Sequence, residues 1–390
     1  MRPVTFLLIA TAALAQGPRI QLSHTTESLR GVSAVSHEIA WASGTHGTYL
    51  RTTDAGLTWT PAQVPDAVTL DFRAVVAFSA DEAFLMSAGP GDQSRIYHTT
   101  DAGQHWQLQF TNANPKGFFD SMAFWDPKHG IVLGDPIPDD KGQLKFELLQ
   151  TDDGQTWHPI PPSQLPPALE GEGAFAASNS CIAILPAASS KSSAATPRDV
   201  PTDDAPDPNI WFATGGKAAR VFHSPDRGQT WQVFDTPILH GPASAGIFSI
   251  AFRDPLHGVI AGGDYKHPRD DGPNLAFTAD GGKTWTLSDI HPQAYFSAVA
   301  YDTQVNEEAV REQAAEAREE SAGKKIRVKP LPPQRLFIVG QDFIFDFRPP
   351  LNPRRINGKK RSGYTFNAVS PYPDGGALIV GGKGTIASVP

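Results

Sequence analysis

The octet TTDAGLTW occupies residues 52–59, and four variants of it follow along the chain. They are TTDAGQHW at 99–106, QTDDGQTW at 150–157, SPDRGQTW at 224–231 and TADGGKTW at 278–285. Three of the four intervals between successive octets are similar in length, and the interval before the fourth octet is longer. A period of roughly 50 residues with insertions is typical of propellers and solenoids, in which each repeat is one supersecondary unit.

The stretch around the second octet predicts the content of one unit. FRAVVAF, AFLMS, RIYHT and, after the octet, the segment beginning WQLQF are short apolar runs separated by turns. Four strands in a meander form one propeller blade, with the octet as the turn before the last strand. The fold class predicted for the chain is therefore all-β.

Counting first strands gives seven blades although there are only five octets. The seven segments are LRGVSAVS, DFRAVVAF, FFDSMAFW, GAFAASNS, IFSIAFRD, YFSAVAYD and TFNAVSPY. The last unit ends at LIVGGKGTIASVP without a fourth strand, and the segment RIQLSHTTES near the N-terminus could supply it from about Ile20 to His24. We therefore expect a seven-bladed β-propeller closed by the N-terminal strand, because closure removes exposed sheet edges.

The octet residues are predicted to stabilise the fold and not to catalyse a reaction. An aspartate in a turn accepts hydrogen bonds from backbone amides, and the glycine two positions later can take a positive φ. A tryptophan is bulky enough to fill the space between neighbouring blades. The residues concerned are Asp54, Trp59, Asp101, Trp106, Asp152, Trp157, Asp226, Trp231, Asp280 and Trp285.

The octet pattern resembles the Asp-box, or BNR repeat, of sialidases, sortilin-type receptors and related propellers. Together with WASGTHGTYLRTTDAGLTW, GPGDQSRIYHTTDAGQHW and AFWDPKHGIVLGDP, it makes most of the chain similar to the photosystem II stability/assembly factor-like propellers. The sixth and seventh units depart from that pattern because they lack octets. The resemblance implies a bacterial, exported member of the family with a non-enzymatic assembly role, and an Asp-box on the face away from the ligand.

The N-terminal segment and the single cysteine suggest an exported protein. Residues 1–15 contain Arg2, an apolar stretch and a small-residue cleavage motif, as secretory signal peptides do. Residues 16–390 would then form one propeller domain in the periplasm or outside the cell, without a transmembrane segment. Cys181 is the only cysteine and is expected to be a buried hydrophobic residue.

Two long insertions interrupt the repeats. Residues 186–208 have the composition of a linker, and residues 305–330 begin with a polar stretch rich in helix-forming residues. Both are expected on the octet face, as solvated segments within the fourth and sixth blades. The basic run at 352–361 is expected to be a solvated loop, and nucleic acid is not expected as a partner of an exported protein.

The loops opposite the octets are expected to form the binding mouth. The candidate ligand-binding residues there are Arg73, Asp120, Asp135, Glu172, Arg220 and Asp264. The sequence contains no GxGxxG or GxSxG motif and no histidines at metal-ligand spacing, so we expect no cofactor and no metal. The predicted function is a monomeric binding or assembly module for a protein or glycan; the alternative is a glycoside hydrolase or sialidase-like enzyme that uses a pair of these carboxylates.

Overall fold

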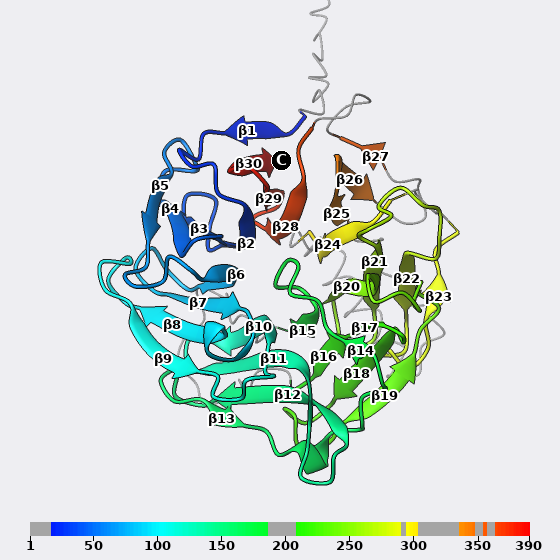
Figure 1. The fold of residues 1–390 in the computed structure, drawn as a ribbon. Coiled ribbons are helices and arrows are strands. Elements are labelled where there is room, and N and C mark those ends of the chain that lie inside the picture. Colours follow the sequence, from blue (N-terminus) through cyan, green and yellow to red (C-terminus); the bar gives the residue numbers. More distant parts are fainter. Residues whose placement is uncertain (1–16, 186–207, 290–293, 303–334, 348–353, 357–362) are drawn as a thin grey trace, which may run out of the picture.

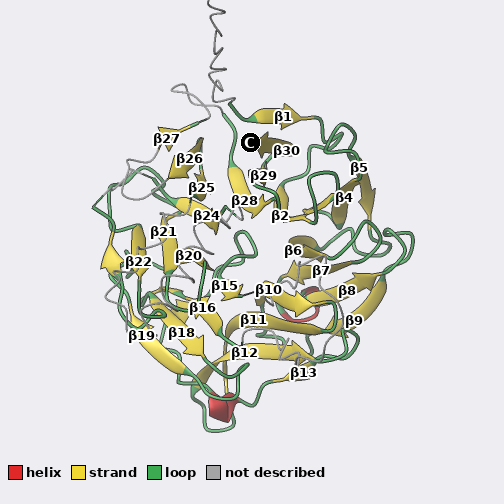
Figure 2. Ribbon diagram, turned by 180° about the vertical axis from the view of Figure 1, so that it is seen from behind, coloured by secondary structure: helices red, strands yellow, loops and turns green. Residues whose placement is uncertain are grey.

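The computed structural model describes residues 17–185, 208–289, 294–302, 335–347, 354–356 and 363–390. Their strands form seven antiparallel sheets arranged around a central axis (Figures 1 and 2). In the described ranges, the regular secondary structure consists of strands and two 3₁₀ helices, η1 (Gly91–Gln93) and η2 (Pro162–Gln164), and no helix there is long and apolar enough to cross a membrane. The fold is a seven-bladed β-propeller, which confirms the prediction.

The first three blades follow one another without long interruptions. Blade 1 contains β2 (Leu29–Ala34), β3 (Ala40–Gly44), β4 (Thr48–Thr52) and β5 (Thr60–Gln63). Blade 2 contains β6 (Asp71–Ala77), β7 (Ala83–Ala88), β8 (Arg95–Thr99) and β9 (Gln107–Thr111). Blade 3 contains β10 (Phe119–Asp126), β11 (His129–Pro138), β12 (Leu144–Thr151) and β13 (His158–Pro159).

The other four blades contain the insertions and the ring closure. Blade 4 contains β15 (Ile182–Ile184), β16 (Ile210–Ala213), β18 (Arg220–Ser224) and β19 (Gln232–Asp235). Blade 5 contains β20 (Ala245–Phe252), β21 (Gly258–Asp264), β22 (Leu275–Thr278) and β23 (Thr286–Leu287), and its sheet is extended by β17 (Gly215–Gly216) and β14 (Glu172–Gly173). Blade 6 contains β24 (Phe296–Tyr301), β25 (Leu336–Gly340), β26 (Phe343–Phe347) and β27 (Arg354–Arg355). Blade 7 contains β28 (Phe366–Pro371), β29 (Ala377–Gly381), β30 (Thr385–Val389) and β1 (Arg19–Gln21).

The N-terminal strand closes the ring as predicted. Strand β1 pairs antiparallel with β30, with Ile20 opposite Ala387, so both ends of the described chain lie in blade 7 (Figure 1). The strand is shorter than the predicted segment from Ile20 to His24, because it ends at Gln21. Gln21 is buried, and its Oε1 accepts a hydrogen bond from Nε1 of Trp59 at 2.8 Å, which ties blade 7 to blade 1.

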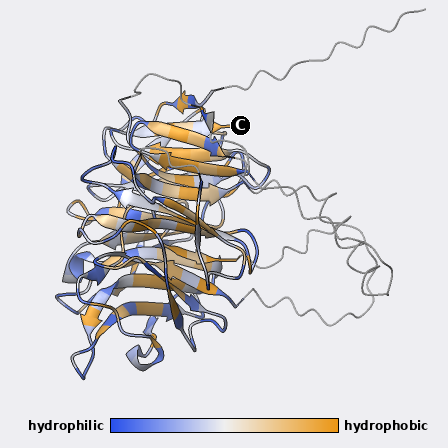
Figure 3. Cartoon of the chain, turned by 90° about the vertical axis from the view of Figure 1, so that its right-hand side faces the viewer, coloured by the Kyte–Doolittle hydropathy of each residue, from blue (hydrophilic) through white to orange (hydrophobic). Residues whose placement is uncertain are grey.

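The hydrophobic core consists of seven separate clusters, one between each pair of neighbouring blades. For example, Trp41 and Tyr49 of blade 1 share a cluster with Phe72 and Leu85 of blade 2. Apolar residues accordingly run along the strands in the side view (Figure 3). Burial between sheets therefore holds the blades together, and no blade has a core of its own.

The octets connect the third and fourth strands of blades 1 to 5, and four of them share one hydrogen-bond pattern. In the first, Oδ1 of Asp54 accepts a hydrogen bond from the Thr58 amide at 2.9 Å, and Oγ1 of Thr52 accepts one from the Gly56 amide at 3.0 Å. Gly56 has φ = 73°, a conformation that favours glycine. Hydrogen bonds from the Thr58 hydroxyl and amide lower the pKa of Asp54, so the turn favours the ionised carboxylate.

The third octet uses a different aspartate from the one that its alignment predicts. Oδ1 of Asp153 accepts hydrogen bonds from the amides of Gln155 and Thr156, both at 2.7 Å. Asp152, which aligns with Asp54, is exposed, and its carboxylate accepts a hydrogen bond from the side chain of Gln150. The prediction for Asp152 is wrong because this turn is one residue tighter: Thr151 bonds the Gly154 amide three residues later, whereas Thr52 bonds the amide four residues later.

The octet tryptophans pack against the preceding blade, but they are not equally buried. Trp59 is only 2% exposed and belongs to the cluster between blades 7 and 1. Trp106 is half-buried against Trp41 and Tyr49, and its Nε1 has no hydrogen-bond partner among the described residues. The remaining three, Trp157, Trp231 and Trp285, are each less than 10% exposed.

The segment predicted as the first strand of blade 4 is instead a loop. Of residues 173–180, only Gly173 lies in a strand, and it pairs with Gly215. The loop that follows reaches the centre of the ring before β15 begins (Figure 1). We call residues 174–177 the plug. Its small apolar residues suggested a strand, but hydrogen bonds from blades 2 and 3 hold its backbone instead.

Several predictions fall outside the described residues. These are the signal peptide at 1–15, nearly all of the insertion at 186–208, the insertion at 305–330, and most of the basic run at 352–361. The described strands on either side place the first insertion between β15 and β16 and the second between β24 and β25.

Candidate functional site

Six of the seven first strands contain a β-bulge at the same position. In each, the pairing register with the second strand skips the residue that follows a large, fully buried apolar side chain near the start of the strand. A bulge leaves its extra residue unpaired and redirects the side chain. The six bulge residues are Arg30, Arg73, Asp120, Phe248, Ser297 and Asn367.

Five of these bulge residues line one central cavity of about 630 Å³. The cavity lies where the first strands begin. Because strands alternate in direction, this is the face opposite the octets, as expected for the mouth. The plug contributes to the wall on the side of blade 4, so the cavity is surrounded by the whole ring. A cavity of this size is typical of small-ligand and peptide side-chain sites.

Two guanidinium groups face this cavity from neighbouring blades. Nε of Arg73 lies 2.9 Å from Oδ2 of Asp71, and its Nη1 donates a hydrogen bond to the Ala176 carbonyl at 2.7 Å. Nε of Arg30 is buried and has no hydrogen-bond partner within the described part of the chain. Burial, followed by the charge of Arg73, lowers the pKa of Arg30. The two arginines therefore form a charged arc on the cavity wall, and among the described residues Nε of Arg30 is left without an acceptor.

Two carboxyl groups of blade 3 hold the plug. Oδ1 of Asp135 accepts a hydrogen bond from the Ala174 amide at 3.0 Å. Asp120 is 1% exposed and accepts one from the Ala176 amide, while its Oδ2 has no partner among the described residues. Burial, and after it the charge of Asp135, raises the pKa of Asp120 well above its usual value. Burial also raises the pKa of Asp135.

An aromatic wall stands opposite the charged arc. The rings of Phe175 and Phe248 are stacked with centroids 3.9 Å apart, and Tyr295 meets Phe248 edge-on at 4.7 Å. Tyr265 also lines the cavity and is 49% exposed, so its ring can contact a ligand directly. The cavity thus combines guanidinium donors with a flat apolar surface.

Glu172 and Arg220 lie outside the cavity and pair with each other. Nε of Arg220 donates a hydrogen bond to Oε1 of Glu172 at 2.9 Å, and the Glu172 side chain is fully buried. The same oxygen accepts a hydrogen bond from the hydroxyl of Thr214, and the other oxygen accepts one from the amide of Leu169. With its acceptors in use, Glu172 anchors the chain just before the plug.

Asp264 is close to the cavity but does not line it. Its Oδ1 accepts a hydrogen bond from the Lys266 amide at 2.9 Å, and its Oδ2 lies 2.9 Å from Nδ1 of His267. These contacts fix the loop that carries Tyr265. Of the six predicted residues, the structure therefore brings Arg73, Asp120 and Asp135 together at the cavity and places Glu172, Arg220 and Asp264 in its support.

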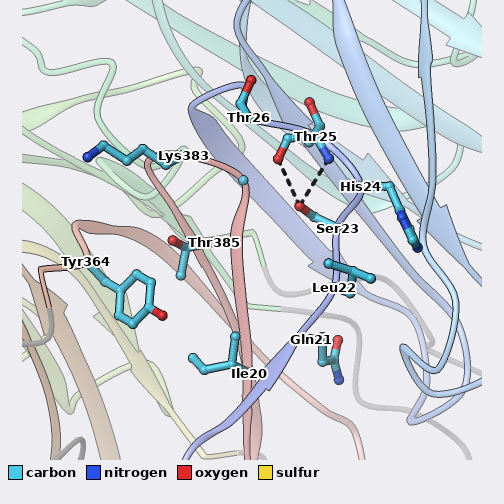
Figure 4. A pocket seen from close by; sticks show the side chains of 11 residues that line it. Ile20, Gln21, Leu22, Ser23, His24, Thr25, Thr26, Tyr364, Lys383 and Thr385 are labelled. Atoms are coloured by element: carbon cyan, nitrogen blue, oxygen red, sulfur yellow. Dashed lines mark hydrogen bonds between the residues drawn. The ribbon is translucent and has the colours of Figure 1, made fainter.

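A second cavity of about 590 Å³ lies at the ring closure, beside β1. Tyr364 and Lys383 line it on the side away from the N-terminal segment, and Ser23 forms hydrogen bonds with Thr25 in its wall (Figure 4). This cavity contains none of the predicted site residues. In the described ranges, no three His, Cys, Asp or Glu side chains converge as metal ligands.

Five residues that line the cavity were not predicted from the sequence: Arg30, Asn367, Phe175, Phe248 and Tyr295. A signal for three of them was present, because Arg30, Phe248 and Asn367 occupy the same place in their first strands as Arg73 and Asp120. Aligning the strands on the large buried apolar residue near their start identifies that column. Phe175 and Tyr295 lie in loops and have no such signal.

Comparisons with known proteins support the fold. No protein-family profile matches the chain, and no curated protein sequence matches it. Among solved structures, "YCF48 bound to D1 peptide" has a TM-score of 0.60 at 14% identity and covers 98% of this chain and 99% of that one. YCF48 from Cyanidioschyzon merolae gives 0.55 at 15%, covering 96% and 98%. The WD40 propeller domain of Doa1 gives 0.53 at 9%, covering 96% and 97%. At these identities the likeness shows the propeller fold alone.

Proposed function

We propose that the chain is an exported, non-enzymatic module that binds a segment of another protein at the central cavity. The observation that carries this proposal is the open cavity at the mouth, which combines free guanidinium donors with exposed aromatic surface. A structural neighbour of the same architecture is described as bound to a peptide, which supports the choice of a protein over a glycan. The octets would act as Asp-box turns on the opposite face and stabilise the blades.

The alternative, glycoside hydrolysis, is less well supported by the cavity. Such enzymes need one carboxyl protonated and its neighbour ionised. Asp120 and Asp135 both have raised pKa values, and both bond the plug backbone. A glycan panel screened for binding and turnover tests this alternative. Turnover that disappears in a folded Asp135→Asn variant would establish the enzyme and overturn the binding-only proposal.

The binding proposal is tested by capturing partners from envelope extracts and mapping where they bind. Tyr265→Ala removes an exposed aromatic ring from the cavity and should weaken a captured partner by about 1 to 3 kcal/mol, the range of an interface anchor. Tyr364→Ala is the matched control, because Tyr364 is 40% exposed but lines the other cavity. Equal effects of the two variants would contradict binding at the mouth.

Export is tested separately by expressing the full chain in a bacterial host and sequencing the N-terminus of the product. We expect a mature protein that begins at Gln16 and lies in the periplasm or medium. Retention of residues 1–15 in the cytoplasm would contradict the signal peptide.

A further inference from the structure

The two arginines at the cavity differ in their partners: among the described residues, a carboxylate pairs with Arg73 but none pairs with Arg30. Arg30 and Arg73 occupy equivalent bulges of adjacent blades, so both project toward the same side of the mouth. Asp71 pairs with Arg73 through Oδ2. No described carboxylate forms an ion pair with Arg30, and its buried Nε is unpartnered. A buried guanidinium donor without an acceptor is costly unless a ligand or water satisfies it.

We propose that Arg30 and Arg73 bind one carboxylate, and that the aromatic wall of the same cavity takes the apolar group that carries it. This inference rests on the proposed function and names the chemical group by which the mouth recognises its ligand. A guanidinium fork matches a carboxylate in shape and charge, whereas a neutral amide offers only one acceptor oxygen.

The other groups at the cavity are compatible with an anion. Asp120 also lines the cavity with one oxygen unpartnered among the described residues, and burial together with Asp135 raises its pKa, which lowers the negative charge that a ligand would meet. Oδ1 of Asp71 is buried and unpartnered, but Oδ2 is paired with Arg73. The hydroxyl of Tyr295 lies within electrostatic range of both arginines and is a further donor, because burial raises the pKa of the phenol.

The apolar part of the ligand is defined by the opposite wall. Phe175 and Phe248 form a stacked pair, and Tyr265 and Tyr295 each pack edge-on against Phe248. Flat aromatic surfaces bind planar or branched apolar groups. The cavity of about 630 Å³ admits one such group with its carboxylate, as at the C-terminus of a polypeptide or in a free aromatic acid.

The test uses three probes that differ in charge and source. N-acetylphenylalanine represents a chain end, 3-phenylpropionate represents a free acid, and N-acetylphenylalaninamide is the neutral counterpart of the first. Binding of each to the mature protein is measured by ligand-detected nuclear magnetic resonance at millimolar concentration. We expect N-acetylphenylalanine to bind about tenfold or more tightly than its amide, the effect of one charge-assisted hydrogen bond.

Substitution of single arginines then tests whether the preference for acid over amide depends on Arg30. Arg30→Gln should remove the preference for acid over amide and leave the fold intact, because among the described residues no carboxylate forms an ion pair with Arg30 and its Nε donates no hydrogen bond. Arg95→Gln is the matched control, because Arg95 begins β8 on the same face and pairs with Asp92 outside the cavity.

The two acids distinguish the sources of the carboxylate. Preferential binding of 3-phenylpropionate over N-acetylphenylalanine would assign the site to free acids; the reverse order would assign it to chain ends.

Equal binding of acid and amide, no detectable binding of either acid, or an acid preference that survives Arg30→Gln would overturn the inference. Its failure is distinguishable from failure of the proposed function. If binding of a captured partner is still weakened by Tyr265→Ala but is equally tight with a free or an amidated C-terminus, the mouth binds protein without recognising a carboxylate.

Discussion

At the scale of single residues, the octet aspartates act through short local hydrogen bonds that require an ionised carboxylate. The amide and then the side chain of His105 lower the pKa of Asp101 to about 2. Bonds from Thr156 and Gln155 lower the pKa of Asp153 further still. A carboxyl whose pKa is lower in the folded state stabilises the fold above its unfolded value, and that contribution is lost as the pH falls.

The third octet offers a direct comparison of adjacent aspartates. Asp153→Asn should lower the melting temperature at pH 7, because the turn loses its charged acceptor. The difference from the wild type should shrink as the pH falls below the usual aspartate value of 3.8, where the wild type also begins to lose this contribution. Asp152→Asn should melt like the wild type at every pH. Melting curves at pH 7 and pH 3 check this, and equal losses in the two variants at pH 7 would contradict the assignment to Asp153.

The tryptophans differ in the free energy that they contribute. Trp59→Ala removes a ring that is 2% exposed and a hydrogen bond to Gln21, so it should lower the free energy of unfolding by about 3 to 5 kcal/mol. Trp106→Ala should cost less, because its ring is only half-buried and its Nε1 makes no hydrogen bond among the described residues. Urea unfolding of both variants measures the difference. A larger loss for Trp106→Ala would show that burial does not determine the ranking.

At the scale of elements, the N-terminal strand closes the ring with few contacts. Strand β1 is three residues long; its middle residue, Ile20, is 49% exposed, and Leu22, which follows the strand, is 69% exposed. Its contribution comes from pairing with β30 and from Gln21, which bonds Trp59 in the next blade. An unpaired β30 would expose a free sheet edge.

Truncation tests this closure. A chain that lacks residues 1–21 should melt at a lower temperature and self-associate, because the edge of β30 and the Nε1 of Trp59 lose their partners. A chain that lacks only residues 1–17 retains β1 and is the control. Thermal unfolding and size-exclusion chromatography distinguish the two. Identical melting temperatures would mean that blade 7 is stable without its fourth strand.

At the scale of the whole molecule, every hydrophobic cluster is shared by two blades. Unfolding one blade alone would expose two clusters at once, and the closed ring has no terminal blade from which unfolding could begin. The stability of the blades is therefore expected to be coupled around the ring.

Calorimetry tests this coupling. The protein should unfold in one transition, and Trp59→Ala in blade 1 and Trp285→Ala in blade 5 should each shift that entire transition to lower temperature. Trp285 is 9% exposed in the cluster between blades 4 and 5, so it probes the ring far from its closure. Two resolved transitions, each moved by only one variant, would show that the blades unfold independently.

The sequence alone was sufficient to predict the seven blades, the octet turns and the closing strand. These features depend on interactions within a few residues or on a pattern that repeats. A Thr, an Asp and a Gly at fixed spacing form the same turn wherever they occur, as at Asp54 and Asp280. Alternating apolar residues likewise predict a strand without reference to its neighbours.

Only the tertiary structure determined the composition of the cavity, the loop in place of the first strand of blade 4, and the aspartate used by the third octet. Arg73 bonds the Ala176 carbonyl 103 residues away, and this long-range contact, with those of Asp120 and Asp135, turns a segment that reads as a strand into the plug. Glu172 and Arg220 were predicted to bind ligand at the mouth. They lie 48 residues apart in the sequence, and in the structure they form a buried ion pair with each other. The choice of Asp153 over Asp152 depends on which carboxylate reaches Thr156 in a tighter turn. Such outcomes depend on distances across the ring or on backbone geometry, which residue types and spacing do not specify.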